Sequence, residues 1–139
     1  MRTPQIDKLA PFTKLLGLNV SRVEEGYCQG VLETDDKLKN IHETQGKVVR
    51  ILHGGIISTL ADTCMAFALV SSLDEDELPR TLEIKVSYFA AVTSGALVCE
   101  SKIVHKGGSF AALESEITND GRLVAKATAT FGIVKAKRD

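Results

Sequence analysis

The residues most able to do chemistry lie in the run L-H-G-G-I-I-S-T-L-A-D-T, from Leu52 to Thr63. Two glycines, Gly54 and Gly55, stand at the expected start of an apolar helix. The first N–H groups of a helix have no partner within it, and glycine has no side chain to keep a ligand from its amide. We therefore interpret these amides as an oxyanion site. Asp62, inside the same helix, supplies a base or nucleophile, and the combination suits acyl chemistry.

The spacing of these groups has a consequence for assembly. Gly54 and Asp62 are eight positions apart, and a helix rises about 1.5 Å per residue, which separates them by roughly 12 Å. One carbonyl group cannot contact both. If both act on the same bond they belong to different chains, so we expect catalysis to require at least a homodimer.

Small residues share the helix face of Asp62. Gly55, Ser58, Thr59 and Ala66 stand at i, i+3 and i+4 spacings around it. This pattern predicts a groove in an otherwise bulky helix, and we assign Gly55 and Ser58 to substrate binding.

Composition narrows the functional classes. The chain has 139 residues, of which 44% are hydrophobic and 25% charged, which is typical of one soluble globular domain spanning residues 1–139. A formal net charge of -1 argues against a nucleic-acid partner. The histidines are too scattered for a metal site, and no paired-cysteine spacing is present. We expect no metal and no cofactor.

The cysteines and the apolar segments of the sequence bear on the cellular location of the protein. Cys28, Cys64 and Cys99 are widely spaced in apolar stretches, which predicts buried free thiols and a cytoplasmic location. His53 and Asp62 interrupt the most apolar segment, and no apolar run near the N-terminus is long enough for a signal sequence. We expect neither secretion nor membrane insertion.

The first third of the chain is predicted to form short helices, a pair of short strands and a loop. Helical spacing from Ile6 to Leu16 predicts one or two short helices broken at Pro11 and capped by Gly17. Strand-like runs at 18–24 and 27–33 predict a hairpin. The polar stretch 34–47 predicts a mobile loop, which either covers a site or only connects elements.

The remainder predicts one long helix followed by strands. The helix runs from Gly54 to about Ser71, and the strands span 81–89, 96–105, 110–118 and 123–134, with a tight Asn-Asp-Gly turn at 119–121. Because helix and strands are segregated, we predict an α+β fold, a curved antiparallel sheet around one buried helix. The apolar surface that one small sheet leaves uncovered favours a second copy of the chain.

Two segments carry a resemblance to a known family. The run from Leu52 to Thr63, supported by T-L-E-I-K-V-S-Y-F at Thr81–Phe89, resembles the hotdog-fold acyl-CoA thioesterases, in particular their PaaI-like branch. The resemblance implies a hotdog fold and a dimer, or a dimer of dimers, with a continuous sheet and active sites at the interface. It also implies an acyl-CoA substrate, with coenzyme A present only as part of that substrate.

The resemblance further implies roles for single residues. The Gly54 amide polarises the thioester carbonyl, Asp62 acts on the carbonyl carbon or on a water, and Thr81 places a hydroxyl near that carboxylate. Relatives place an Asn or Gln about six residues before the histidine, where this chain has Lys47. Gln45 and Asn40 are nearby, and we assign that role to Gln45.

Two features keep two interpretations each. We assign His53 to the substrate-binding residues. Its imidazole either takes part in catalysis or has a structural role at the start of the helix. The segment Lys106, Gly107, Gly108 and Ser109 is either a plain glycine turn or a contact for the phosphates of coenzyme A, as in related thioesterases.

The sequence thus predicts a cytoplasmic acyl-CoA thioesterase acting through a carboxylate, since G-x-S-x-G is absent and no cysteine is paired with a histidine in a recognisable motif. A non-catalytic acyl-CoA-binding regulator on the same fold is one alternative, disfavoured because no DNA-binding helix-turn-helix is attached. A hotdog-fold acyl-thioester dehydratase is the other. The sequence does not specify the acyl group.

Overall fold

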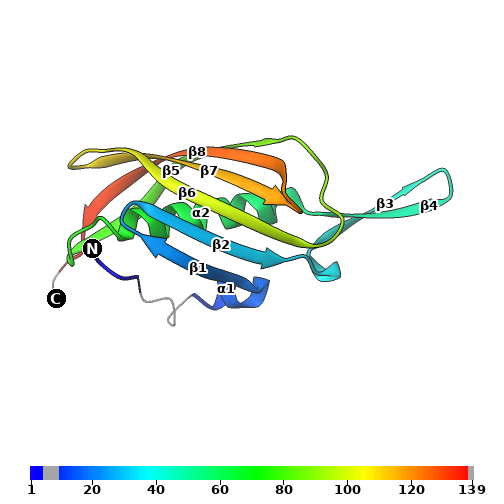
Figure 1. The fold of residues 1–139 in the computed structure, drawn as a ribbon, viewed down its shortest axis with the longest axis horizontal. Coiled ribbons are helices and arrows are strands. Elements are labelled where there is room, and N and C mark those ends of the chain that lie inside the picture. The colour runs from blue at the N-terminus through cyan, green and yellow to red at the C-terminus, as the bar shows by residue number, and fades with distance from the viewer. Residues whose placement is uncertain (5–9, 138–139) are drawn as a thin grey trace.

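The structure is a computed structural model that describes residues 1–4 and 10–137 (Figure 1). Two short helices and two pairs of short strands precede one long helix, and four long strands follow it. In chain order these are α1 (Pro11–Leu16), β1 (Leu18–Glu24), β2 (Tyr27–Glu33), the short 3-10 helix η2 (Asp36–Leu38), β3 (Lys39–Thr44), β4 (Lys47–Leu52), α2 (Gly54–Val70), β5 (Glu77–Tyr88), β6 (Ala96–Lys106), β7 (Phe110–Asn119) and β8 (Arg122–Lys135).

Six strands form one antiparallel sheet in the order β1-β2-β6-β7-β8-β5, so the strand that follows α2 lies at an edge. All six strands contact α2, which means that the sheet curves around the helix. The predicted α+β architecture, an antiparallel sheet around one long helix, is confirmed.

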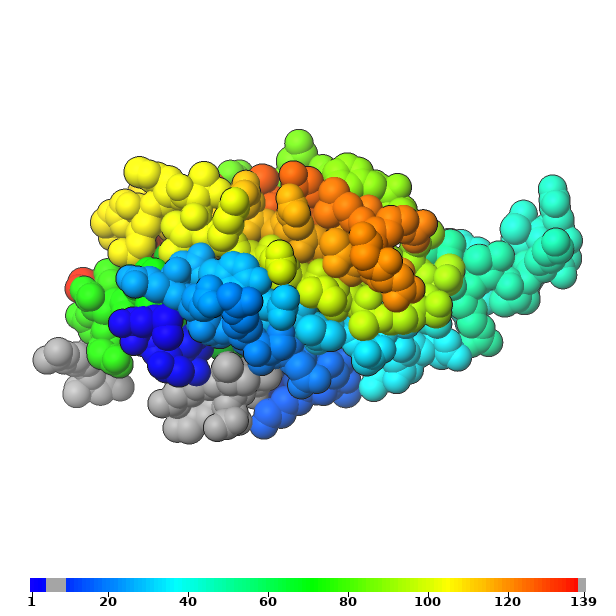
Figure 2. Space-filling view, viewed as in Figure 1, coloured from blue at the N-terminus to red at the C-terminus, as the bar shows by residue number. Residues whose placement is uncertain are grey.

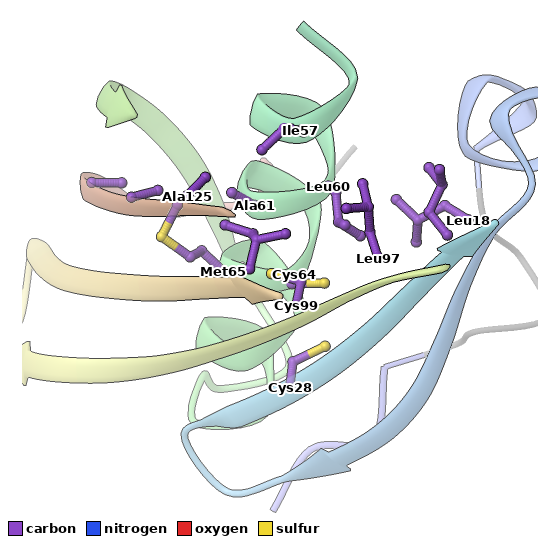
Figure 3. Packing of buried hydrophobic residues seen from close by; sticks show 14 of the residues in the cluster. Leu18, Cys28, Ile57, Leu60, Ala61, Cys64, Met65, Leu97, Cys99 and Ala125 are labelled. Carbon is purple, nitrogen blue, oxygen red and sulfur yellow. The ribbon is translucent and has the colours of Figure 1, made fainter. Parts of the chain in front are cut away.

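The core lies between α2 and the sheet. Leu60, Ala61, Cys64 and Met65 of α2 have no exposed surface. Figure 3 shows these side chains directed toward residues of the strands, and it shows Cys28, Cys64 and Cys99 gathered in one region. All three cysteines are buried free thiols, as the sequence predicts.

The last three strands match their predicted ranges to within one residue at each end. The turn between β7 and β8 explains this agreement. Asp120 and Gly121 both have positive φ, 52° and 77°, and a two-residue turn with two positive φ angles has a twist that fits a tight hairpin. Gly17 also ends α1 as predicted, with a φ of 74°.

The predicted loop at 34–47 is wrong. The segment forms η2 and then β3, which pairs with β4 in a two-stranded hairpin that we call the arm. Figures 1 and 2 show the arm projecting from the body of the molecule. Because β3 is exposed apart from half-buried Lys39, its sequence lacks the alternation of apolar and polar residues that marks a strand with one buried face.

Two further boundaries differ. β5 begins at Glu77 rather than Thr81 and includes Pro79, which an edge strand accepts because proline cannot donate to a neighbouring strand. α1 begins at Pro11, the first helical position, where proline is favoured. The part of the predicted N-terminal helix at 5–9 lies outside the described residues. Among the described residues, no helix is long and apolar enough to cross a membrane.

Candidate active site

The first turn of α2 is capped by the residue before it. His53 is the N-cap, and its Nδ1 accepts a hydrogen bond of 2.8 Å from the Gly55 N–H. This satisfies one of the helix amides that have no intrahelical partner. His53 therefore has a structural role at the helix start, and its part in substrate binding stays a prediction. One of the two glycine amides is occupied, and within the described part of the chain no acceptor pairs with the Gly54 N–H.

Tyr88, at the end of β5, packs over Gly54. Its hydroxyl donates a 2.8 Å hydrogen bond to the Gly54 carbonyl. A Cβ placed on Gly54 would lie 3.3 Å from two atoms of the Tyr88 ring, which is tighter than an ordinary contact. Glycine therefore allows the close approach of this tyrosine, since any Cβ would force the ring to shift by a few tenths of an ångström. The Tyr88 hydroxyl in turn holds the Gly54 carbonyl in place.

A shallow apolar cleft opens at this glycine. It has a volume of about 370 Å³, within the range of small-molecule sites. It is formed where β4 ends, α2 begins and β5 ends. We call it the Gly54 cleft, and its lining residues are Ile51, Leu52, Gly54, Ile57, Tyr88, Phe89, Ala90, Ala91 and Val92.

Asp62 lies about two turns further along α2 and is half-buried. The Thr81 hydroxyl on β5 donates a 2.6 Å hydrogen bond to its Oδ1. Such a bond to a charged acceptor is short and orients the carboxylate. The structure therefore brings together Asp62 and Thr81, which are 19 positions apart in the sequence.

Asp62 also lines the larger of the two clefts that contact the candidate groups. This Asp62 cleft has a volume of about 640 Å³ and lies between α2 and the N-terminal segment. Its lining residues are Arg2, Thr3, Pro4, Ala10, Thr13, Asp62, Thr63, Ala66, Phe67, Val70 and Glu75. Ala66 is thus beside Asp62, as the small-residue pattern predicts, whereas Gly55, Ser58 and Thr59 do not line this cleft.

The Ser58 and Thr59 hydroxyls, near the start of α2, form hydrogen bonds to the helix backbone. Ser58 Oγ and Thr59 Oγ1 both donate to the Gly55 carbonyl, over 3.0 Å and 2.8 Å. Side-chain bonds of this kind, from a residue to a carbonyl one turn earlier, are local helix contacts. In this conformation Ser58 presents no free hydroxyl proton to a ligand, and its predicted part in substrate binding stays a prediction.

Gln45, the predicted upstream amide, lies at the tip of the arm. It is exposed, its φ is 51°, and it forms the turn with Gly46. The tip is about 20 Å from the base, given six residues at roughly 3.3 Å each. Asn40 is instead the amide side chain at the base, opposite Ile51 and therefore close in register to the start of α2. The sequence offers both amides, and its spacing favours Gln45 because the hairpin separates Asn40 from His53 along the chain.

The segment 106–109 forms the turn between β6 and β7. The Gly107 N–H donates to the Phe110 carbonyl, and the Ser109 carbonyl accepts from Ile133. The strand register places Lys106 in the same transverse row of the sheet as Thr81, three strands away. At about 4.8 Å between strands this is roughly 14 Å. The turn predicted from the sequence is present, and its phosphate contact stays a prediction.

The cysteine nearest to Asp62 is not a candidate nucleophile. Hydrogen bonding to Cys28 and Cys99, together with burial, raises the pKa of the Cys64 thiol well above its usual value. A thiol reacts as the thiolate, so a raised pKa makes it inert near neutral pH. The described residues also hold no group of three His, Cys, Asp or Glu side chains that could bind a metal ion.

Comparisons with known proteins identify the family. The family model described as the thioesterase superfamily matches residues 50–126, which is more than half of the chain and includes α2, β5, β6, β7 and the start of β8. The chain belongs to the thioesterase superfamily. The predicted resemblance to hotdog thioesterases is confirmed at this level, and the PaaI-like branch stays a prediction.

Individual relatives agree with this assignment. The chain is 26% identical over 124 residues to the 1,4-dihydroxy-2-naphthoyl-CoA hydrolase of Listeria monocytogenes, covering 88% of this chain and 95% of the relative. It is 26% identical over 135 residues to the medium/long-chain acyl-CoA thioesterase YigI of Salmonella typhimurium, covering 87% of this chain and 84% of the relative. The conserved protein PA5202 of Pseudomonas aeruginosa has a similar structure, with a TM-score of 0.83, 28% identity and coverage of 94% and 99%.

Proposed function

We propose that the protein is a cytoplasmic acyl-CoA thioesterase that hydrolyses the thioester to a free acid and coenzyme A. The observation that carries the proposal is the bond from Thr81 to Asp62, which orients a carboxylate beside a large cleft in a thioesterase-superfamily chain. Two relatives are named for acyl-CoA substrates, which supports the same substrate class. Three free buried thiols support a reducing compartment.

In this mechanism the Gly54 N–H donates to the carbonyl oxygen of the thioester. It stabilises the negative charge that develops when the carbonyl carbon is attacked, which is worth about 3 kcal/mol for one well-placed donor. Tyr88 donates to the Gly54 carbonyl, which belongs to the next peptide along the chain, and so it fixes the residue that carries the donor. The donor is therefore held in position before the substrate binds.

Asp62 activates the attack in one of two ways. As a base it takes a proton from water while the water oxygen bonds to the carbonyl carbon; the tetrahedral intermediate then expels the coenzyme A thiolate, which takes up a proton. As a nucleophile its oxygen bonds to the carbonyl carbon and expels the coenzyme A thiolate, which takes up a proton. Water then cleaves the resulting mixed anhydride, which releases the free acid and restores the Asp62 carboxylate. General base catalysis contributes roughly 10² to 10⁴ in rate. Either path uses only side chains, backbone and water.

The two groups act from different subunits. They are about 12 Å apart along α2, so Gly54 of one chain and Asp62 of another meet at one thioester. β5 supplies the means for this pairing, because it is 12 residues long and forms an edge of the sheet. Two β5 edges pair to make one continuous sheet in a dimer, which is the unit of a dimer of dimers if four chains assemble.

Polar groups around the pair complete the substrate site. Lys106 and the glycine turn that follows it contact the phosphates of coenzyme A. Asn40, at the base of the arm, lies beside the helix start and takes the part that the family resemblance gives to an upstream amide. No nucleic acid takes part.

The test is hydrolysis of a panel of acyl-CoAs by the wild type and by Asp62→Asn. We expect the variant to lose roughly 10² to 10⁴ in kcat/KM. Asp120→Asn, in an exposed turn, is the matched control and keeps full activity. Equal activity of Asp62→Asn and the wild type would remove the carboxylate from the mechanism. Tight acyl-CoA binding without turnover by the wild type would point to the regulator, and hydration of an enoyl thioester would point to the dehydratase.

A further inference from the structure

The arm stands apart from the rest of its own chain. Within the described ranges, β3 and β4 form a two-stranded sheet separate from the six-stranded one. Figure 1 shows the arm at the end of α2 where the helix begins, pointing away from it. Ile41 and Val48 on the arm are 62% and 58% exposed. A single two-stranded hairpin is marginally stable in water, so contact with another molecule favours the arm.

The two faces of the arm lead to different places. Paired residues of the two strands alternate between the faces. The face that we call the cleft face holds Asn40, His42, Thr44, Lys47, Val49 and Ile51. Because Ile51 also lines the Gly54 cleft, this face continues that cleft outward from the body. The opposite face holds Ile41, Glu43, Val48 and Arg50.

The proposed two-subunit site sets the direction of the partner's α2. Gly54 of each chain meets Asp62 of the other, and a two-fold axis relates the two contacts. The two α2 helices therefore run antiparallel, with the axis at the level of Ser58, midway between these residues. Beyond Asp62 of the partner subunit, the second half of its α2 extends past Gly54, in the direction in which the arm projects (Figure 1).

The lengths and the apolar side chains of the two elements match. Val70 lies about 12 Å beyond Asp62 along α2, at 1.5 Å per residue, and the arm is about 20 Å long. The arm therefore spans the second half of the partner's α2 and reaches the residues that follow it. Phe67 and Val70 in that half are partly exposed, and so is Val49 on the cleft face.

The charges at the far end match as well. Asp74 and Glu75, which follow α2, are exposed, and no salt bridge in the described part of the chain involves their carboxylates. Lys47, at the tip of the cleft face, is exposed and forms no salt bridge with a described residue. Opposite charges that meet at an interface fix its register.

We infer that the cleft face of the arm packs on the second half of α2 in the partner subunit, with Lys47 opposite Asp74 and Glu75. The inference rests on the proposed function, which supplies the antiparallel arrangement of the helices. The second half of α2 also lines the Asp62 cleft. Each arm is therefore a wall of the site in the other subunit, and Val49 is its apolar contact.

The first test compares one substitution on the two faces. Val49→Gln places an amide in the contact, whereas Val48→Gln, its neighbour on the opposite face, is the matched control. Each dimer has two such contacts, so we expect Val49→Gln to raise the dissociation constant of the dimer by about 30-fold or more. Val48→Gln leaves it unchanged. Sedimentation velocity over a dilution series measures both.

The second test reverses the charges. We expect Lys47→Glu to raise the dissociation constant about tenfold over two contacts. Adding Asp74→Lys and Glu75→Lys to the same chain restores opposite charges and brings the constant back toward the wild-type value. Glu43→Lys, on the opposite face, is the control and has no effect.

The third test is a covalent link. The arm and the end of α2 lie at opposite ends of one chain (Figure 1), so a disulfide between them joins two chains. We expect Lys47→Cys with Glu75→Cys to form a covalent dimer on oxidation with diamide, and Glu43→Cys with Glu75→Cys to remain monomeric on a denaturing gel. The three native thiols are buried and do not compete.

Four results would overturn the inference: a monomeric wild type, an equal or larger effect of Val48→Gln, no recovery on charge reversal, or loss of only a tetramer to dimers, which would mean that the arm joins dimers. Hydrolysis of acyl-CoA is measured separately. A dimer that depends on the arm but hydrolyses no acyl-CoA removes the proposed function alone. An active dimer that is insensitive to all arm variants removes only the role of the arm.

Discussion

Helix α2 carries both halves of the candidate site, and they are held in different ways. At its first turn the functional group is the Gly54 N–H. The peptides around it are fixed by hydrogen bonds that involve the His53 and Tyr88 side chains. Two turns further on, the functional group is a carboxylate, oriented by one bond from Thr81. The first half depends on backbone position and the second on side-chain chemistry.

The surroundings of the two halves differ as well. The Gly54 cleft is shallow and is formed by elements of the body of the molecule, with a volume of about 370 Å³. The Asp62 cleft is larger, about 640 Å³, and has the N-terminal segment as one wall. In the dimer that we propose, the thioester would lie between two subunits, and each half of the site has its own cleft beside it.

After Asp62→Asn, the largest expected effect comes from removing the backbone donor at the first turn of α2. Gly54→Pro eliminates the N–H, and proline is tolerated at the first helical position. We expect kcat/KM to fall by about 10² to 10³. We also expect a lower melting temperature than that of the wild type, because the added Cβ requires the Tyr88 ring to shift. An active Gly54→Pro protein would show that this amide is not the oxyanion donor.

Mixing two inactive proteins then tests whether the halves belong to different chains. In a random equal mixture of Gly54→Pro and Asp62→Asn, about half of the dimers are mixed and each has one intact site. We therefore expect roughly one quarter of wild-type activity to return. A mixture of Gly54→Pro with wild type, with subunit exchange measured by mass spectrometry, is the control. No recovery after complete exchange would place both groups in one chain.

The fold was predictable wherever the sequence alternates. β7 and β8 have one face against α2 and one in solvent, and their turn requires two positive φ angles, so both the pattern and the Asn-Asp-Gly signal are local. The arm has no buried face, and nothing in its polar composition distinguishes a hairpin from a loop. Gln45 was assigned to the site for the same reason, since its distance from His53 in sequence is not its distance in the fold.

The sequence predicted which groups could react, and it did not predict which other residues hold them in place or line the clefts beside them. Spacing and glycine chemistry pointed to Gly54 and Asp62, and the family resemblance pointed to Thr81. The bond from Tyr88 joins residues 34 positions apart, and the Asp62 cleft uses the N-terminal segment. Neither leaves a periodic signal, because both depend on how distant elements pack together.

A smaller loss of rate is expected when the hydrogen bond that orients Asp62 is removed. Thr81→Val removes the hydrogen bond to Asp62 and keeps the side-chain shape. Hydrogen bonds to charged groups contribute about 1.5 to 3 kcal/mol, so we expect kcat to fall by roughly 10- to 100-fold with little change in KM. Thr81→Ser restores the hydroxyl and most of the rate. A change confined to KM, or no rescue by serine, would contradict an orienting role.

A further variant weakens the support of the backbone half. Tyr88→Phe keeps the ring over Gly54 and loses the bond to the Gly54 carbonyl. A net hydrogen bond is worth about 1 kcal/mol, so we expect kcat/KM to fall about fivefold. Tyr27→Phe, on β2, is the control and leaves the rate unchanged. A loss as large as that of Gly54→Pro would instead assign the Tyr88 hydroxyl to direct contact with the substrate.

The smallest effect on activity is expected at His53, where stability changes instead. His53→Ala removes the acceptor for the Gly55 N–H, and loss of an N-cap costs about 1 kcal/mol of the free energy of unfolding. His53→Asn keeps a capping acceptor, and we expect it to recover that stability, as measured by urea denaturation. Both variants should stay within about threefold of wild-type kcat, because the ring acts on the helix and not on the substrate. A stable His53→Asn protein with strongly reduced kcat would show that the imidazole takes part in the reaction.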